Sequence, residues 1–206
     1  MELRERIIQE ASELFFKNGI KSITMSDIAN QLGVSKRTLY ENFKDKEELL
    51  DVCLTFRMDH EERELDKLIA GSEDVITTML RIYAKHLNEA HTTGKTTIND
   101  FKKYYPRLYK KIQDRHGCSI EHFFPLFQKG FEQGLIRDVD FEICIWLIKS
   151  QFKALIEGDS LPVEKYSMNQ FVRTIILNFV RGIATPKGNE LIDEIVKKLT
   201  ESENKK

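Results

Sequence analysis

Apolar residues recur at intervals of three and four along almost the whole chain, which is the spacing of one face of an α-helix. The first such stripe begins at Leu3 and ends at Asn18-Gly19, where glycine tolerates the positive φ with which helices commonly stop. No segment alternates with the period of two that is typical of strands. The pattern therefore predicts an all-α fold.

The segment after this first stripe predicts two short helices joined by a tight turn. Thr24 and Asp27 form a capping box at the start of the first, and Gly33 is placed to end it. Ser35 can cap the second, which continues through Phe43. Three helices then fall within about forty residues, which is the spacing of a helix-turn-helix motif.

A further capping box, formed by Asp45 and Glu48, opens a long helix from Lys46 to about Ala70. Beyond it the pattern stays helical, and a helix that includes Phe141 follows a cap at Asp138 or Asp140. Breaks are predicted at Gly71-Ser72, Thr92 to Gly94, Pro106, Gly117, Gly134, Gly158 to Pro162 and Pro186 to Gly188.

The helix capped by Ser35 displays basic and polar side chains. Leu39 and Phe43 are four residues apart and form its apolar face, so the remaining side chains point elsewhere. Basic and hydroxyl groups at the start of such a helix can donate to guanine O6 and N7 and contact a thymine methyl group. We expect this recognition helix to read bases through Lys36, Arg37 and Thr38.

Phosphate contacts are expected from the flanks of this helix. The amino end of the preceding helix, around Thr24 and Ser26, presents free amides to an anion. Tyr40, Asn42 and Lys46 can also donate to the DNA backbone. The alternative is a surface helix with solvated charges, which an isolated Lys-Arg pair would favour, but the two capped helices favour DNA binding.

The charge of this region is modest, with four basic and two acidic residues between positions 36 and 46. The whole chain carries 32 basic and 33 acidic residues, so any role with nucleic acid must be local. Tight binding to double-stranded operator DNA then requires two modules, as a symmetric homodimer supplies.

The stretch ITMSDIANQLGVSKRTLYENFKDKEELL, Ile23–Leu50, resembles the amino-terminal pattern of the TetR family of bacterial transcriptional repressors. The resemblance is strong from Ile7 to about Leu50, and the remainder agrees in helical content and length. It implies a DNA-binding domain at residues 1–46 fused to a helical effector-binding and dimerisation domain at residues 47–206. It also implies a homodimer that a small-molecule effector releases from palindromic operator DNA.

The family pattern assigns roles to matching positions of this chain. It places Thr24 and Ser26 beside phosphates, Lys36, Arg37 and Thr38 beside bases, and Tyr40, Asn42 and Lys46 as backbone clamps. Many members carry Gly at the position of Arg37 and His at that of Asn42, so this chain departs from the pattern at one base-side and one backbone position.

Two apolar helices near the carboxyl end predict a dimer interface. The first, over residues 141–156, is apolar nearly all round, which indicates burial on two sides. The alternative is a pair of ordinary core helices in a monomer, and we favour the dimer because the basic patch is small. The interface residues are predicted to be Ile143, Trp146, Leu147, Phe171, Ile175 and Phe179.

Aromatic residues are frequent between these helices and the DNA-binding segment, and some could line an apolar cavity with Tyr or His as polar handles. Plain core packing is the alternative for most of them. The expected occupant is a largely apolar or aromatic small-molecule effector. The candidate lining residues are Met79, Tyr83, His86, Phe101, Tyr105, Tyr109, Phe123 and Phe127.

No membrane span, cofactor or metal site is predicted. The apolar run at residues 143–148 is far shorter than a bilayer requires, and the odd, scattered cysteines suit a reducing, cytoplasmic compartment. His116, Cys118 and His122 lack a fourth ligand, and Gly117 is expected to interrupt the helix between His116 and the other two.

No motif of nucleophilic or metal-dependent catalysis occurs, so the protein is not expected to be an enzyme. The leading hypothesis is a ligand-responsive repressor. The alternatives are a constitutive DNA-binding regulator without an effector and a helical protein that binds small molecules.

Overall fold

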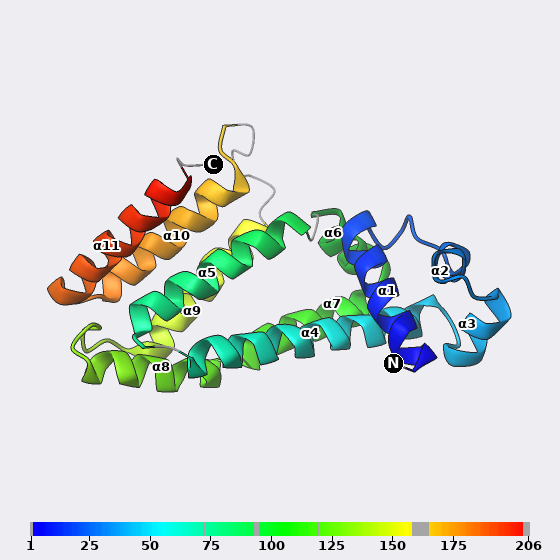
Figure 1. Cartoon of the computed structure of the whole chain (residues 1–206), viewed down its shortest axis with the longest axis horizontal. Coiled ribbons are helices and arrows are strands. Elements are labelled where there is room, and N and C mark those ends of the chain that lie inside the picture. The colour runs from blue at the N-terminus through cyan, green and yellow to red at the C-terminus, as the bar shows by residue number, and fades with distance from the viewer. Residues whose placement is uncertain (1, 72, 93–94, 119, 158–164, 204–206) are drawn as a thin grey trace. The chain divides into compact units, whose positions relative to one another are not determined.

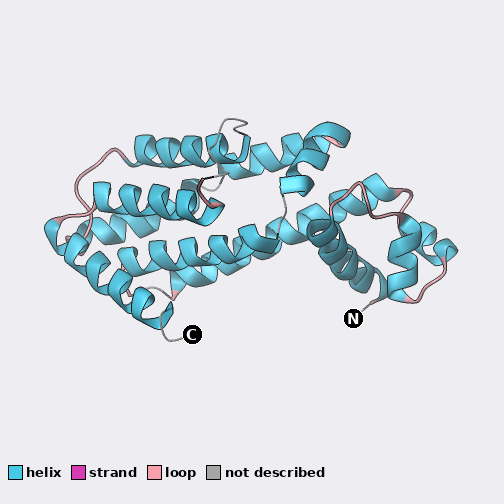
Figure 2. Cartoon of the chain, turned by 90° about the horizontal axis from the view of Figure 1, so that it is seen from above, coloured by secondary structure: helices cyan, strands magenta, loops and turns pink. Residues whose placement is uncertain are grey.

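The computed structural model describes the chain except residues 1, 72, 93–94, 119, 158–164 and 204–206. Within helices it also leaves undescribed the side chains at 83, 86–92, 95–96, 116–118, 120–122, 152, 155–157, 168 and 199–203. The described residues form helices joined by short connections, which confirms the all-α fold class (Figures 1 and 2).

The helices follow one another along the chain with few residues between them. Their bounds are α1 (Leu3–Asn18), α2 (Met25–Leu32), α3 (Lys36–Asn42), α4 (Lys46–Ala70), α5 (Val75–Thr92), α6 (Lys95–Tyr104), α7 (Pro106–Cys118), α8 (Ile120–Glu132), α9 (Phe141–Glu157), α10 (Met168–Ile183) and α11 (Pro186–Glu203). None of those in the described part combines the length and hydropathy of a membrane span.

The chain divides into two compact units, which are described separately below. The first contains Met1–Leu65 and Asn88–Gly117, and the second contains Asp66–Leu87 and Cys118–Lys206. Helices α4 and α5 each contribute residues to both. The first unit thus includes α6 and most of α7, and the predicted functional boundary between residues 46 and 47 remains a prediction.

Polar caps fix the ends of the short helices in the first unit. The capping box of α2 is complete, with the Asp27 amide donating to Thr24 Oγ1 and the Thr24 amide donating to Asp27 Oδ2. Gly33 ends α2 with φ 66°, a left-handed conformation that glycine adopts without steric cost. Ser35 Oγ then accepts the Thr38 amide at the start of α3. These caps confirm the predicted starts of α2 and α3.

The start of α4 differs slightly from the prediction. Asp45 Oδ1 accepts the Glu48 amide at 2.8 Å, as a capping box requires. The Glu48 carboxylate, however, accepts the Lys44 amide at 2.7 Å rather than that of Asp45. The Glu48 side chain therefore bonds the amide one residue before the one that a capping box predicts.

One hydrophobic core holds the first unit together. It joins the apolar faces of α1 to α4 to those of α6 and α7. Its most deeply buried large side chains are Ile7, Phe15, Ile20, Ile28, Leu39, Phe43, Leu49, Leu50, Phe101 and Leu108. The three-helix segment is thus packed against residues that follow it by more than fifty positions.

A seam of ion pairs also joins α7 to α4 in this unit. Cations spaced four residues apart on α7 face carboxylates on α4. The pairs are Arg107 with Glu47 and Asp51, Lys111 with Asp51, and Arg115 with Asp59 and Glu62. Single exposed pairs contribute little, but this repeated spacing fixes the register of the two helices.

In the second unit, α8, α9, α10 and α11 pack in sequence around a separate core. The loop after α8 bonds to the turn before α11, with the Arg137 amide donating to the Ile183 carbonyl and the Thr185 amide donating to that of Leu135. A Cβ atom at Gly188 would lie 2.3 Å from the same Leu135 oxygen. Only glycine therefore allows this close approach of α11.

Several predicted helix boundaries are confirmed, and one is wrong. Asp140 is the cap of α9, because its Oδ1 accepts the Ile143 amide at 3.0 Å. The helix expected to break at Gly117 instead continues to Cys118, and α8 begins at Ile120. Because a single glycine near a helix end costs only about 1 kcal/mol, the surrounding helix can override it.

Candidate nucleic-acid interface

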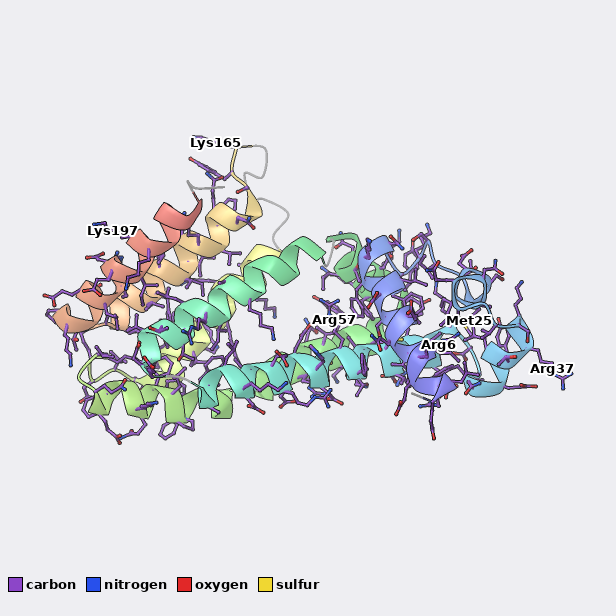
Figure 3. All side chains as sticks on the ribbon, in the orientation of Figure 1. Arg6, Met25, Arg37, Arg57, Lys165 and Lys197 are labelled. Carbon is purple, nitrogen blue, oxygen red and sulfur yellow. The ribbon has the colours of Figure 1, made fainter. Side chains whose placement is uncertain are left out.

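Helix α3 has one buried face and one exposed face, as the sequence predicts. Leu39 and Phe43 are 0% and 1% exposed, respectively, and belong to the core of the first unit. On the other faces, Lys36 and Tyr40 are exposed, and the Arg37 side chain retains 89% of its accessible surface. Figure 3 shows Arg37 pointing away from the ribbon.

The Arg37 guanidinium is held only by its own helix. Its Nε donates to Glu41 Oε1 at 2.9 Å, one helical turn further on. Both side chains are mostly exposed, and pairs of this kind contribute little to stability. The guanidinium can therefore leave the carboxylate for another acceptor at small cost.

Asn42 and Thr38 are linked to each other on the same helix. Asn42 Nδ2 donates to the Thr38 carbonyl at 2.8 Å, and Thr38 Oγ1 lies 2.8 Å from Ser35 Oγ. Both side chains are half-buried. One of the two Asn42 amide hydrogens remains for another acceptor.

At the amino end of α2, the Thr24 hydroxyl already has a partner. Thr24 Oγ1 lies 2.6 Å from Asp27 Oδ2, and these hydrogen bonds hold the pKa of the Asp27 carboxyl below its ordinary value. The helix end therefore carries a fixed carboxylate, with Ser26 half-buried beside it. The positive charges of Lys46 and Lys36, at the starts of α4 and α3, also lower the pKa of Asp27.

Lys46 is bound inside the first unit more closely than the sequence suggested. Its Nζ donates to the Ile20 carbonyl at 2.6 Å and lies 5.7 Å from the centre of the Phe15 ring. Partial burial lowers the pKa of Lys46, and the carboxylates of Asp100 and Asp27 oppose that shift. An ammonium has three donors, so this bond leaves capacity for a phosphate.

Two arginines of α1 contact the end of α2 and the end of α3, and these contacts were not predicted from the sequence. Arg6 donates from Nη2 to the Leu32 carbonyl at 2.7 Å, which satisfies the carboxyl end of α2. The Arg4 guanidinium lies 4.9 Å from the centre of the Phe43 ring. Their partners lie more than twenty positions away in sequence, so no local pattern could have indicated them.

The pattern described as "Bacterial regulatory proteins, tetR family" matches residues 7–53, which span α1 to the first part of α4. The chain belongs to the TetR family. It is 25% identical over 173 residues to the uncharacterised HTH-type transcriptional regulator YhgD of Bacillus subtilis, covering 79% of this chain and 88% of that protein. The protein is thus a TetR-family transcriptional regulator rather than an enzyme.

Solved structures of regulators share the fold. A transcriptional regulator from Cytophaga hutchinsonii aligns with a TM-score of 0.68 at 20% identity, covering 88% of this chain and 98% of that one. A putative regulator from Saccharomonospora viridis in complex with choline aligns with the same TM-score at 18% identity, covering 88% and 97%. These alignments extend the TetR-like architecture over the helices that follow residue 53.

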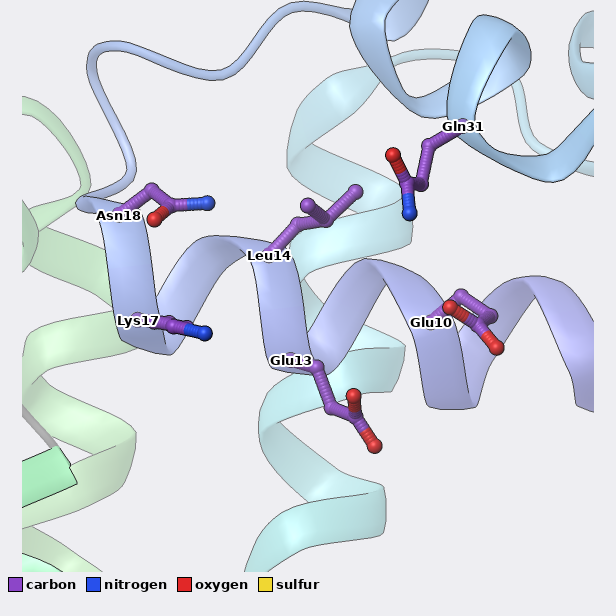
Figure 4. Close-up of a pocket in the computed structure, with 6 residues that line it drawn as sticks. All are labelled: Glu10, Glu13, Leu14, Lys17, Asn18 and Gln31. Atoms are coloured by element: carbon purple, nitrogen blue, oxygen red, sulfur yellow. The ribbon is translucent and has the colours of Figure 1, made fainter.

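A small cleft occurs in the DNA-binding segment of this TetR-family chain. It holds about 180 Å³ and is open to solvent on α1 and α2 (Figure 4). Its lining residues are Glu10, Glu13, Leu14, Lys17, Asn18 and Gln31. Cavities that bind ligands usually hold about 300 to 1,000 Å³, and none of the residues predicted to contact an effector lines this one.

The residues predicted to line an effector pocket divide between the two cores. Phe101, Tyr105 and Tyr109 belong to or pack against the core of the first unit, whereas Met79, Phe123 and Phe127 belong to or pack against that of the second. The side chains of residues 83 and 86, the predicted Tyr83 and His86, lie outside the described set. The described candidates thus belong to two separate hydrophobic cores, and their role remains a prediction.

The residues predicted at a dimer interface differ in exposure. On α9, Ile143, Trp146 and Leu147 are 57%, 66% and 46% exposed. On α10, Phe171, Ile175 and Phe179 are half-buried, and the last two pack against the second core. The surface of α9 is therefore unusually apolar, while α10 supplies part of the core behind it.

The metal candidates lie outside the described side chains. His116 and Cys118 are in α7, whereas His122 is in α8, so Cys118 and His122 do not share one helix as the sequence suggested. Among the side chains that are described, no group of three His, Cys, Asp or Glu residues is placed to hold a metal ion.

Proposed function

We propose that this TetR-family protein is a ligand-responsive repressor that binds palindromic operator DNA as a homodimer. The observation that carries the proposal is the division of α3 into a core-bound face, with Leu39 and Phe43, and an outward face that includes Arg37. A helix fixed in this way presents its side chains to the major groove without losing its own packing.

Lys36, Arg37 and Thr38 read base edges in this proposal. Arg and Lys donate to guanine O6 and N7, and the Thr methyl group contacts thymine. Arg37 leads this set because its guanidinium is exposed and only weakly held by Glu41. A bidentate contact of this kind discriminates against a wrong base by about 1 to 3 kcal/mol.

Phosphates are bound by Thr24, Ser26, Tyr40, Asn42 and Lys46. The Tyr40 side chain is 50% exposed, and Lys46 keeps unused donors beside the amino end of α2. The Thr24 hydroxyl already donates to the Asp27 carboxylate. Backbone amides near Thr24 and Ser26 therefore remain as donors to a phosphate at this helix end.

The homodimer forms through α9 and α10. Three large apolar side chains exposed on one helix favour contact with another protein surface. A second copy of the same surface satisfies this need symmetrically, and it also pairs two modestly charged DNA-binding modules. The two half-sites are then about 10 base pairs apart, or a multiple of that distance.

A small apolar or aromatic effector releases the DNA in this proposal. A structural relative was solved with choline, so a protein of this fold can hold a small molecule. Helix α4 carries the shift, because it contributes residues to both units. A near-complete switch requires the effector to prefer one state by about 5 kcal/mol.

Selection of bound fragments from genomic DNA tests the central proposal. The purified protein should enrich a palindromic sequence, and sedimentation of the complex should show two chains per site. Loss of the complex on adding small molecules identifies an effector, and a reporter gene distinguishes repression from activation. Enrichment without any effector response would favour a constitutive regulator, and no enrichment would contradict DNA binding. Because the proposed function is carried out on DNA, we also expect the protein to act in the cytoplasm.

A further inference from the structure

Helix α6 is bonded to α1 and to the turn between α1 and α2. Asp100, which is only 7% exposed, accepts the backbone amide of Lys21 at its Oδ2, 2.8 Å away. Thr97 Oγ1 lies 3.5 Å from the Phe16 carbonyl, and the Phe101 ring is buried next to that of Phe16. Figure 1 shows α6 beside the end of α1. The position of α6 against this turn is therefore fixed by several contacts.

Two ammonium groups meet at one exposed tyrosine beside this junction. Lys21 Nζ lies 5.5 Å and Lys103 Nζ lies 5.4 Å from the centre of the Tyr104 ring, which is 41% exposed. A hydrogen bond from Lys21 and the charge of Lys103 lower the pKa of the Tyr104 hydroxyl. Neither lysine forms an ion pair with a carboxylate among the described residues.

A simpler explanation covers only part of this arrangement. Lysines in the last turn of a helix complement its negative carboxyl end, which accounts for Lys103 on α6. It does not account for Lys21, which comes from a different element and approaches the same ring. Two cations and a phenol hydroxyl together form a site with an unneutralised positive charge, which favours an anion.

This cluster continues the surface proposed to bind DNA. Lys46 is one of the proposed phosphate-binding residues, and its ammonium donates a hydrogen bond to the carbonyl of Ile20, the residue directly before Lys21. Thr24, at the amino end of α2, follows three residues later. Successive phosphates of one strand are spaced by 3.4 Å along the duplex axis, so a row of donors can follow the backbone.

We propose that Lys21, Lys103 and Tyr104 bind a DNA backbone phosphate beyond the bases read by α3. The inference rests on the proposed function, because it extends the same DNA-binding surface. It assigns α6, which lies outside the helix-turn-helix motif, a direct part in DNA binding.

The test uses the full chain and a duplex of random sequence, so it requires no knowledge of the operator. Binding is followed by fluorescence anisotropy at increasing KCl concentration. The slope of log K against log salt is negative, and each lost phosphate contact reduces its magnitude by about 0.9. Because the two lysines share one phosphate, we expect Lys21→Ala and Lys103→Ala each to reduce the magnitude of the slope by up to that amount per bound chain. Tyr104→Phe should weaken binding less.

Lys197→Ala is the matched control, since it removes one exposed cation from α11 in the second unit. Lys21→Ala keeps the backbone amide that Asp100 accepts, so the turn remains tied to α6. Thermal unfolding checks that each variant folds. On selected operator DNA, the lysine variants should lose affinity equally for correct and mismatched sites.

The outcomes separate this inference from the proposed function. If the wild-type protein binds no duplex, the proposed function and this extension both fail. If it binds, and the Lys21 and Lys103 variants keep the slope of the wild type and of Lys197→Ala, the α6 contact is refuted while DNA binding stands. A reduced slope in both lysine variants but not in the control supports the contact.

Discussion

Helices α3 and α9 both bury one face and display another, but the displayed chemistry differs. On α3 the outward residues include Lys36, Arg37 and Tyr40, which combine charge with hydrogen-bonding groups. On α9 they include Ile143 and Trp146, which are largely apolar and more than half exposed. A helix in the first unit thus suits a charged, hydrated partner, and a helix in the second suits another protein surface.

The difference shows why burial alone does not identify a binding surface. Basic side chains such as Arg37 remain hydrated without a partner, so their exposure is not itself unfavourable. An exposed indole such as Trp146 stays in contact with water unless something covers it. The chemistry of each exposed face therefore indicates the kind of partner, and variants can test the two faces separately.

The largest effect is expected from removing the support beneath α3. Phe43→Ala deletes a ring that is 1% exposed, so the free energy of unfolding should fall by about 3 to 5 kcal/mol. Chemical denaturation measures this change. Tyr40→Ala is the control, because its ring is half exposed and its loss should lower stability by about 1 kcal/mol or less. Equal losses would show that α3 has no distinct core face.

In the second unit, Gly188→Ala tests the close approach of α11. The new Cβ would lie 2.3 Å from the Leu135 oxygen, so we expect a loss of about 3 kcal/mol in unfolding free energy. Gly182→Ala, also in a helix, meets no atom within 4 Å and should stabilise the protein by about 0.5 to 1 kcal/mol. A gain in unfolding free energy in both variants would mean that helix propensity, and not the contact with the Leu135 oxygen, determines the effect at position 188.

The apolar face of α9 is tested by Trp146→Arg. A guanidinium at the centre of a dimer interface should weaken association by at least about 2 kcal/mol, which sedimentation equilibrium measures. Lys153→Ala, an exposed substitution on the same helix, serves as the control. An intact dimer in the Trp146 variant would place the interface elsewhere.

The charged face of α3 is tested by Arg37→Ala. If Arg37 reads a guanine, base preference at that position should relax, with about 1 to 3 kcal/mol of discrimination lost. Competition between operator variants measures the loss. Glu41→Ala breaks the ion pair but keeps the guanidinium, so it should retain the preference. Unchanged specificity in Arg37→Ala would remove this residue from the base-reading set.

The smallest effect concerns the cap of α2. Thr24→Ala should cost about 1 kcal/mol near neutral pH, whereas Thr24→Ser keeps the hydroxyl and should cost less. Because its folded pKa is lowered, Asp27 contributes stability above its ordinary pKa of about 3.9, and this is lost as the pH falls through the folded value. Thr24→Ala should therefore flatten the acid side of the stability profile. An unchanged profile would contradict the role of this hydrogen bond.

Local signals in the sequence predicted much of the first unit. The caps at Thr24 and Ser35 and the glycine at position 33 depend on neighbours within four residues, so their pattern was readable. The same holds for the burial of Leu39 and Phe43, because helical spacing alone separates the faces. The orientation of the candidate recognition helix followed from these local rules.

Contacts over long sequence distances were not predictable in this way. The bond from Lys46 to the Ile20 carbonyl spans 26 positions, and that from the Lys21 amide to Asp100 spans 79. Helical periodicity indicates that a residue such as Phe101 is buried, but not which of two cores receives it. For that reason the predicted pocket set mixed residues of both cores.

The packing of Phe101 and Leu108 against the first four helices has a consequence for protein engineering. The DNA-binding part that would be transplanted to change operator preference is therefore not one continuous segment of the sequence. A chimaera joined after residue 46 would leave Phe15 and Phe43 with a core completed by a foreign scaffold, and the Lys21 amide without its native acceptor. Exchange of outward side chains on α3 alone avoids this mismatch.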